Sequence, residues 1–117
     1  MESLELEVIE DRPAARVVRL RGPLTINTLF DFRSEAHRNQ SRPIIVDVTE
    51  VPYMDSAGLG SLIGVHASCE RHGHKLIIAG ACERVQVLLQ VTHVEQLLLQ
   101  AADIEAAEAM LGNAATA

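Results

Sequence analysis

Aromatic residues are scarce in this 117-residue chain, which has no tryptophan, one tyrosine and two phenylalanines. A hydrophobic core therefore has to be built from Leu, Val, Ile and Ala. Hydrophobic residues still make up 48% of the chain, which excludes a disordered protein. The length suits a single core, and no repeat or linker divides the sequence. We expect one domain over residues 1–117, ordered from about residue 4 to 111 and ending in a short tail.

Positive charge is also in short supply, because 10 Lys and Arg face 16 Asp and Glu, giving a net charge of −6. A nucleic-acid-binding domain needs a basic surface, and anionic lipid repels an acidic one. No apolar run approaches the roughly 20 residues that span a bilayer, and the acidic start of the chain does not resemble a signal peptide. We expect a cytoplasmic protein that binds no nucleic acid and does not insert into a membrane.

Two cysteines, Cys69 and Cys82, are too few for a disulfide framework, and we expect both to be reduced. Cys69, His72 and His74 have a spacing that suggests metal ligands. However, His74 follows Gly73, where a helix is expected to end, and no fourth ligand is evident. We therefore expect no metal site and no cofactor.

Apolar periodicity predicts strands at residues 4–8, 15–21, 44–48 and 75–79, and helices at 26–38, 56–72, 83–90 and 103–111. Residues 97–99 fit either a short strand or a helix. The first two strands are separated by the turn Asp11-Arg12-Pro13 and are expected to form an antiparallel hairpin. Each later strand–helix–strand step should cross over right-handed. The predicted fold is an α/β domain with a mixed four- to five-stranded sheet and helices mainly on one face.

The most informative segment runs from Pro52 to Gly64 and reads PYMDSAGLGSLIG. It places Ser56 where a buried strand gives way to a helix, at or next to the helix N-cap. Free N–H groups and the helix dipole make this position tolerant of an anion. Ser56 can therefore be a simple cap or the carrier of a phosphate. Ser61 and Thr49 are alternative acceptors in more ordinary helix or loop positions.

The predicted central helix has a side of small residues, namely Ala57, Gly60, Ser61, Gly64 and Ala67 or Ser68. A glycine inside a helix costs about 1 kcal/mol relative to alanine. Two explanations for these glycines fit the sequence equally well. The helix either packs closely against a neighbouring helix of the same domain, or it offers a flat surface to a partner protein.

From the strand that contains Asp47 through Tyr53, Met54, Asp55, Ser56 and Gly58-Leu59-Gly60, the chain resembles the STAS-domain anti-sigma-factor antagonists. The order of elements agrees with that family from Leu4 to about Leu111. The resemblance implies a STAS-like fold and phosphorylation at Ser56 by an anti-sigma factor that is itself a serine kinase. It further implies that the unphosphorylated protein captures this anti-sigma factor, freeing a sigma factor for transcription, and that a phosphatase reverses the mark.

We expect a partner-binding surface around Ser56, which comprises Thr25, Tyr53, Met54, Asp55, Ser56, Ala57, Gly58, Gly60, Ser61 and Gly64. Tyr53 and Met54 can equally be residues that cover the end of the sheet. Thr25 stands where the family commonly has an acidic residue that contributes to this surface. That departure leaves open an interaction or scaffold module, in stress signalling or associated with a transporter, that works without phosphorylation.

Enzymatic activity is not expected. A hydrolase that used Ser56 as its nucleophile would need a Gly-x-Ser-x-Gly turn or a histidine placed by a recognisable pattern. The segment around Ser56 has neither of these features.

Overall fold

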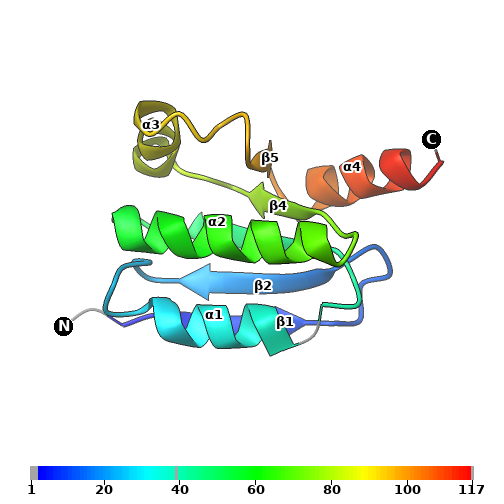
Figure 1. The fold of residues 1–117 in the computed structure, drawn as a ribbon, viewed down its shortest axis with the longest axis horizontal. Helices are drawn as coiled ribbons and strands as arrows, with labels where there is room; N and C mark the ends of the chain where they lie inside the picture. The colour runs from blue at the N-terminus through cyan, green and yellow to red at the C-terminus, as the bar shows by residue number, and fades with distance from the viewer. Residues whose placement is uncertain (1–2, 39, 117) are drawn as a thin grey trace.

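The computed structural model describes residues 3–38 and 40–116, and within these ranges five strands and four helices follow one another (Figure 1). Their bounds are β1 Glu5–Ile9, β2 Arg16–Arg21, α1 Leu29–Arg38, β3 Ile44–Glu50, α2 Ser56–Arg71, β4 Leu76–Ala79, α3 Glu83–Val91, β5 Leu99–Ala101 and α4 Ile104–Thr116. The predicted order of strands and helices is confirmed.

The strands form one sheet in the order β1-β2-β3-β4-β5. β1 and β2 pair antiparallel, as predicted, whereas β3, β4 and β5 each run parallel to the strand before them. Parallel neighbours need a crossover, and each of these crossovers contains a helix. The carboxyl ends of β2 and β3 lie at the same edge of the sheet, so the loops that precede α1 and α2 meet there (Figure 1).

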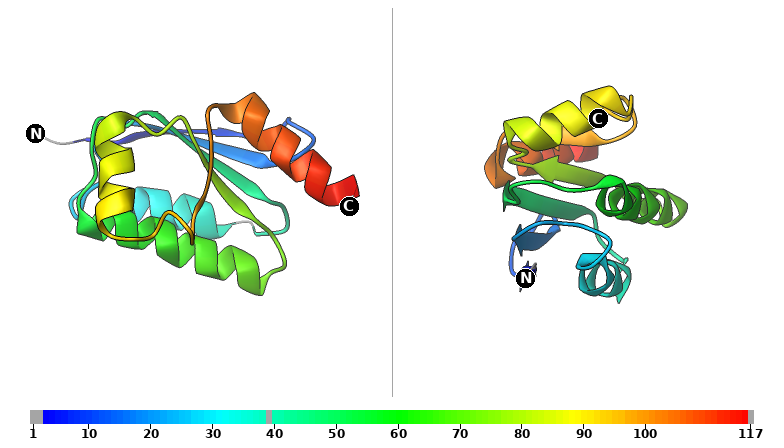
Figure 2. Two further views of the ribbon diagram at one scale, coloured as in Figure 1. Left: turned by 90° about the horizontal axis from the view of Figure 1, so that it is seen from above. Right: turned by 90° about the vertical axis from the view of Figure 1, so that its left-hand side faces the viewer.

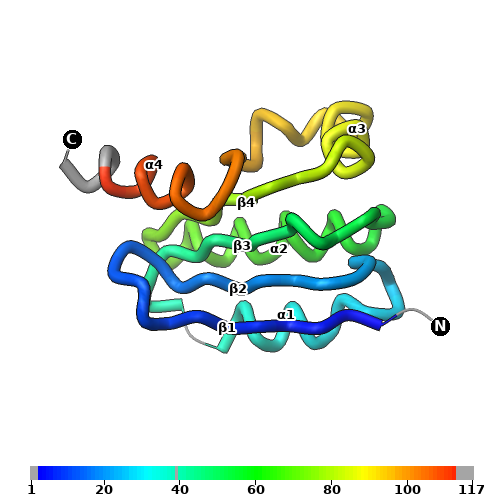
Figure 3. Tube along the Cα trace, turned by 180° about the vertical axis from the view of Figure 1, so that it is seen from behind, coloured from blue at the N-terminus to red at the C-terminus, as the bar shows by residue number. Residues whose placement is uncertain are grey.

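The helices form a layer on each face of the sheet. α1 and α2 lie side by side on one face, α4 covers the other, and α3 lies beyond β4 (Figure 2). Because successive strand residues point to opposite faces, Val18 and Val46 join the core beneath α1 and α2, while Val17 and Ile45 join the core beneath α4. The view from behind shows α4 alone across that second face (Figure 3). The expectation that helices lie mainly on one face is confirmed, with α4 as the exception.

Helix α1 begins at Leu29 rather than at the predicted Ile26. The carbonyl oxygen of Thr25 accepts hydrogen bonds from the backbone N–H groups of Thr28 (3.0 Å) and Leu29 (2.9 Å). Residues 25–28 therefore form a separate turn, which leaves Ile26 exposed in front of the helix.

Three other elements differ from prediction by more than one residue, and the first is β3, which continues past Val48 to Glu50. β5 spans Leu99–Ala101 rather than 97–99, and α4 continues past Leu111 to Thr116. The predicted end at Gly112 is wrong because one glycine costs a helix only about 1 kcal/mol, and the alanines that follow favour helix. Of the predicted tail at 114–117, Ala117 lies outside the described residues.

Candidate functional site

The loops before α1 and α2 are joined by backbone hydrogen bonds. Leu24 and Met54 form an isolated parallel bridge. The N–H of Leu24 donates to the carbonyl oxygen of Tyr53 (3.2 Å), and the N–H of Asp55 donates to that of Leu24 (3.3 Å). Met54 is only 7% exposed. Met54 therefore anchors the loop from inside and offers little surface to a partner.

Asp55 is the N-cap of α2, and Ser56 is the first residue of the helix. One carboxylate oxygen of Asp55 accepts a hydrogen bond from the backbone N–H of Gly58 (2.8 Å), and the other accepts one from that of Ile26 (3.1 Å). A cap of this kind satisfies a donor that the first helical turn leaves unpaired. Because Asp55 does the capping, the hydroxyl of Ser56 is not needed for it. Of the two positions that the sequence allowed, Ser56 takes the one next to the cap.

Ser56 is exposed, and no hydrogen bond to its hydroxyl occurs within the part of the chain that the structure describes. The alternative acceptors are engaged. Ser61 is 6% exposed and its hydroxyl donates to the carbonyl oxygen of Gly58 (2.6 Å). The Thr49 hydroxyl donates to the carboxylate of Asp47 (2.6 Å). Thr49 is exposed as well, but of the three hydroxyls only that of Ser56 is both exposed and free of a hydrogen bond within the described residues.

The glycines of α2 have different surroundings. A Cβ atom at Gly58 would lie 2.0 Å from the carbonyl oxygen of Leu24, so the contact between the two loops requires glycine there. A Cβ atom at Gly60 or Gly64 would meet nothing within 4 Å. Both residues are exposed. Packing within the domain therefore accounts for Gly58 but not for Gly60 or Gly64.

Thr25 is buried, with 4% of its surface exposed. Its N–H donates to the hydroxyl of Thr28 (2.9 Å), and its own hydroxyl accepts a hydrogen bond from the N–H of Asn27 (3.3 Å). Thr25 therefore shapes the turn before α1. The surface at this turn comes instead from the neighbouring Ile26, which is 54% exposed.

A groove of about 530 Å³ runs between α1 and α2. One wall comes from the α1 side and consists of Ile26, Leu29, Phe30, Arg33 and His37. The other wall is the small-residue side of α2, with Ala57, Gly60, Ser61 and Gly64, and it ends at Arg71. The structure thus brings four of the predicted partner-binding residues into one groove.

The α1 wall of this groove is not among the residues predicted to bind a partner. A single face of α1 carries Phe30, Arg33 and His37, at intervals of three and four residues. Ile26 lies in the turn before the helix. Because this face mixes apolar and basic residues, it does not stand out as a hydrophobic stripe. Phe30 is 61% exposed, and that exposure is visible only in the folded protein.

On the other side of Ser56, the ring of Tyr53 is half-buried and the guanidinium of Arg84 lies 5.0 Å from its centre. The thiol of Cys82, at the start of α3, lies 3.5 Å from the carbonyl oxygen of Val51. These contacts hold the loop before α2 against α3, so the groove and Ser56 sit on a supported loop.

Asp47 stabilises the end of β3 that leads into this loop. It accepts hydrogen bonds from the hydroxyl and N–H of Thr49 and from Arg19 (3.0 Å). Burial raises the pKa of Asp47, but the bonds from Thr49 and Arg19 outweigh that effect and leave the pKa below its usual value.

The described residues include no group of three or more His, Cys, Asp or Glu side chains that could hold a metal ion. Cys69 is buried, which raises the pKa of its thiol. His72 Nδ1 is 2.8 Å from the carbonyl oxygen of Ser68. The Cys69–His72–His74 motif is therefore not arranged as a ligand set.

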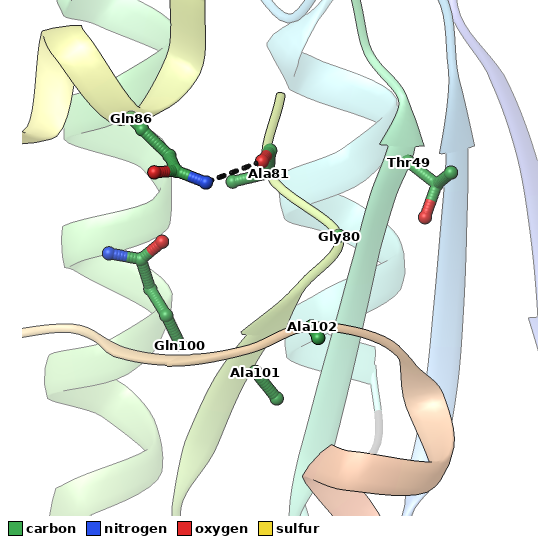
Figure 4. A pocket seen from close by; sticks show the side chains of 7 residues that line it. All are labelled: Thr49, Gly80, Ala81, Gln86, Gln100, Ala101 and Ala102. Carbon is green, nitrogen blue, oxygen red and sulfur yellow. Dashed lines mark hydrogen bonds between the residues drawn. The ribbon is translucent and has the colours of Figure 1, made fainter. Parts of the chain in front are cut away.

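A second cavity, of about 570 Å³, lies at the carboxyl ends of β3, β4 and β5 (Figure 4). Ligands of open α/β sheets commonly bind at this edge. Its walls are small or amide residues, such as Gly80, Gln86 and Gln100, and none of the residues that line it is charged or aromatic. The cavity therefore offers no acid–base pair for catalysis.

In the described ranges, no helix has the length and apolar character that crossing a membrane requires.

Fold and site together define a small α/β domain whose central helix begins at an exposed serine beside an open groove. The STAS domain model matches residues 5–108, and the chain belongs to this family.

Among relatives, the chain is 29% identical over 84 residues to an anti-sigma-B factor antagonist of Staphylococcus aureus, covering 69% of this chain and 78% of that protein. The fold is similar to that of the anti-sigma factor antagonist SpoIIAA in its unphosphorylated form, with a TM-score of 0.75, 20% identity, and coverage of 92% of this chain and 97% of the other. It is also similar to part of the murine anion transporter Slc26a9, with a TM-score of 0.71 and 18% identity, covering 89% of this chain and 18% of the transporter.

Proposed function

We propose that this protein is an anti-sigma-factor antagonist. It binds an anti-sigma factor while Ser56 is unphosphorylated, and it releases that partner when the partner's serine kinase activity phosphorylates Ser56. A phosphatase then restores the binding form, and the cycle regulates sigma-factor-dependent transcription. The role is binding, with no reaction catalysed by this chain.

The observation that carries the proposal is the exposed hydroxyl of Ser56 at the start of α2. It lies beside a groove that has Gly60 and Gly64 in its α2 wall. A kinase can reach this hydroxyl without unfolding the domain. A partner can approach the backbone of α2 because no side chain stands over these glycines. The sequence similarity to an anti-sigma-B factor antagonist supports an anti-sigma factor as the partner.

Phosphate at Ser56 adds about −1.5 to −2 charges at pH 7. The positive end of the helix dipole offsets part of this charge, by roughly 0.3–1 kcal/mol at an exposed site. The domain therefore tolerates the modification. A partner packed over Ser56 would have to strip water from the phosphate, which is far more costly. Phosphorylation thus acts through local charge and bulk, with little refolding.

The second candidate is an interaction or scaffold module that works without phosphorylation. It is favoured by Thr25, which is uncharged and buried where the antagonists commonly have an acidic contact residue. The similarity to part of an anion transporter also fits this reading.

The deciding experiment is an intact-mass measurement of wild type, Ser56→Ala and Ser61→Ala after incubation with ATP and an extract of the source cells. One phosphate on wild type and on Ser61→Ala, with none on Ser56→Ala, supports the switch. If no form gains a phosphate, Ser56→Asp is compared with wild type for binding the partner. Unchanged binding favours the scaffold module.

A further inference from the structure

Two arginines stand apart from the other arginines of this acidic protein. Within the described part of the chain, neither Arg33 nor Arg71 has an ion pair, a side-chain hydrogen bond or a ring contact. The other arginines are engaged with carboxylates, with backbone carbonyls or, for Arg84, with a ring. Both unpaired guanidinium groups line the groove between α1 and α2, and none of the residues that line it is acidic.

The groove has an apolar end and a basic end. α1 and α2 run in the same direction (Figure 1). The hydrogen bond from the N–H of Ile26 to Asp55 holds the turn before α1 against the start of α2. At the other end, Gln40 bonds to Ser68 (2.8 Å) and contacts His37 (3.0 Å). Ile26 and Phe30 therefore lie near Ser56, whereas His37 and Arg71 lie at the far end.

The walls suit a particular kind of occupant. From Ala57 to Arg71 the groove follows α2 for about 21 Å at 1.5 Å per residue, the length of about four helical turns. The α2 wall has open space at Gly60 and Gly64, so the backbone of a partner can approach it closely. Exposed Phe30 and Ile26 offer apolar contact. Guanidinium groups without partners favour carboxylates, which they bind with paired hydrogen bonds.

We propose that the occupant of this groove is an amphipathic helix of the anti-sigma factor, with small or apolar residues over Gly60 and Gly64 and carboxylates at the end facing Arg33, His37 and Arg71. This inference rests on the proposed function and adds the chemistry of the partner segment. With such a partner the protein needs no acidic residue at position 25. The charged contacts that the groove offers are positive instead, and they come from α1 and the end of α2.

The test uses three fluorescent, helix-stapled peptides of about four turns. They share an Ala and Leu face and carry Glu, Gln or Lys at one end. Anisotropy should give the affinity order Glu, Gln, Lys, and Arg33→Glu or Arg71→Glu should weaken the Glu peptide roughly ten-fold while improving the Lys peptide. Arg38→Glu is the matched control, because Arg38 lies on α1 and pairs with Glu35 outside the groove. Circular dichroism checks that each variant is folded.

Several results would overturn the proposal. These are equal affinity for the three peptides, no binding of the Glu peptide at about 1 mM, or Arg33→Glu and Arg71→Glu behaving like Arg38→Glu. Self-association of wild type that Arg33→Glu abolishes would assign the groove to a second copy instead. The Ser56 mass measurement is independent of these results. Peptide selectivity without phosphorylation contradicts the switch alone, and phosphorylation without selectivity contradicts the acidic helix alone.

Discussion

The carboxylate of Asp55 holds the backbone N–H of Ile26 at 3.1 Å while it caps α2 through Gly58. One side chain therefore sets the start of α2 and the position of the turn before α1. Because the groove lies between these two helices, Asp55 controls the geometry of the surface beside Ser56.

Replacing Asp55 by alanine should lower the free energy of unfolding by about 1–2 kcal/mol, since the cap of α2 is lost. Asp55→Asn keeps one oxygen to accept from Gly58 but turns its NH2 group toward the N–H of Ile26, so its loss should be smaller than that of alanine but not zero. Urea unfolding of the two variants beside wild type measures the difference. Equal losses for Ala and Asn would contradict the capping role.

Replacing the glycines of α2 by alanine should have opposite effects on the stability of the domain. Gly58→Ala should destabilise the domain by about 1–3 kcal/mol, because its Cβ atom would collide with the Leu24 carbonyl oxygen. Gly60→Ala and Gly64→Ala should each stabilise it by up to about 1 kcal/mol. Thermal melts measure these changes.

The same two stabilising variants should bind the anti-sigma factor more weakly, since a methyl group would project from the α2 wall into the groove. Binding titrations against wild type test this separately from the melts. A variant that gains stability and keeps full affinity would show that the partner does not approach the backbone there.

A negative charge at Ser56 should remove partner binding while leaving the fold intact. Ser56→Asp should change the free energy of unfolding by no more than about 0.5 kcal/mol, as exposed substitutions generally do, and Ser56→Ala should keep binding. NMR amide shifts of the phosphorylated protein should change around residues 55–60 only. Shift changes spread across the sheet would instead indicate refolding.

Asp47 should make stability depend on pH. Its pKa is lower in the folded protein than in the unfolded chain, so its contribution is present above the unfolded value of about 3.9 and is lost as pH falls through the folded value. Asp47→Asn should cost about 1–3 kcal/mol at pH 7, and the gap from wild type should close at acidic pH. Exposed Glu95→Gln is the control. A gap that persists unchanged at pH 2 would contradict this account.

Much of the fold was predictable from local patterns. Alternation in residues 4–8, the apolar run at 44–48 and helical spacing after Ser56 predict the elements, because burial of one face leaves a period of two or of about 3.6 residues in the sequence. The boundaries at Ile26 and Leu111 were wrong. The turn of Thr25 and Thr28 replaces a first helical turn without altering apolar spacing, and alanines carry α4 past Gly112.

The sequence by itself determined the order of elements, the acidic balance and the place of Ser56 at the start of a helix. Only the tertiary structure decided that Asp55 is the cap, that Gly58 is required by Leu24 while Gly60 and Gly64 are open, and that Arg33 and Arg71 face one groove. The physical reason is that propensity and periodicity act between neighbours in the chain. Which side chains are left without partners depends on a crossover that brings together helices separated by the whole of β3.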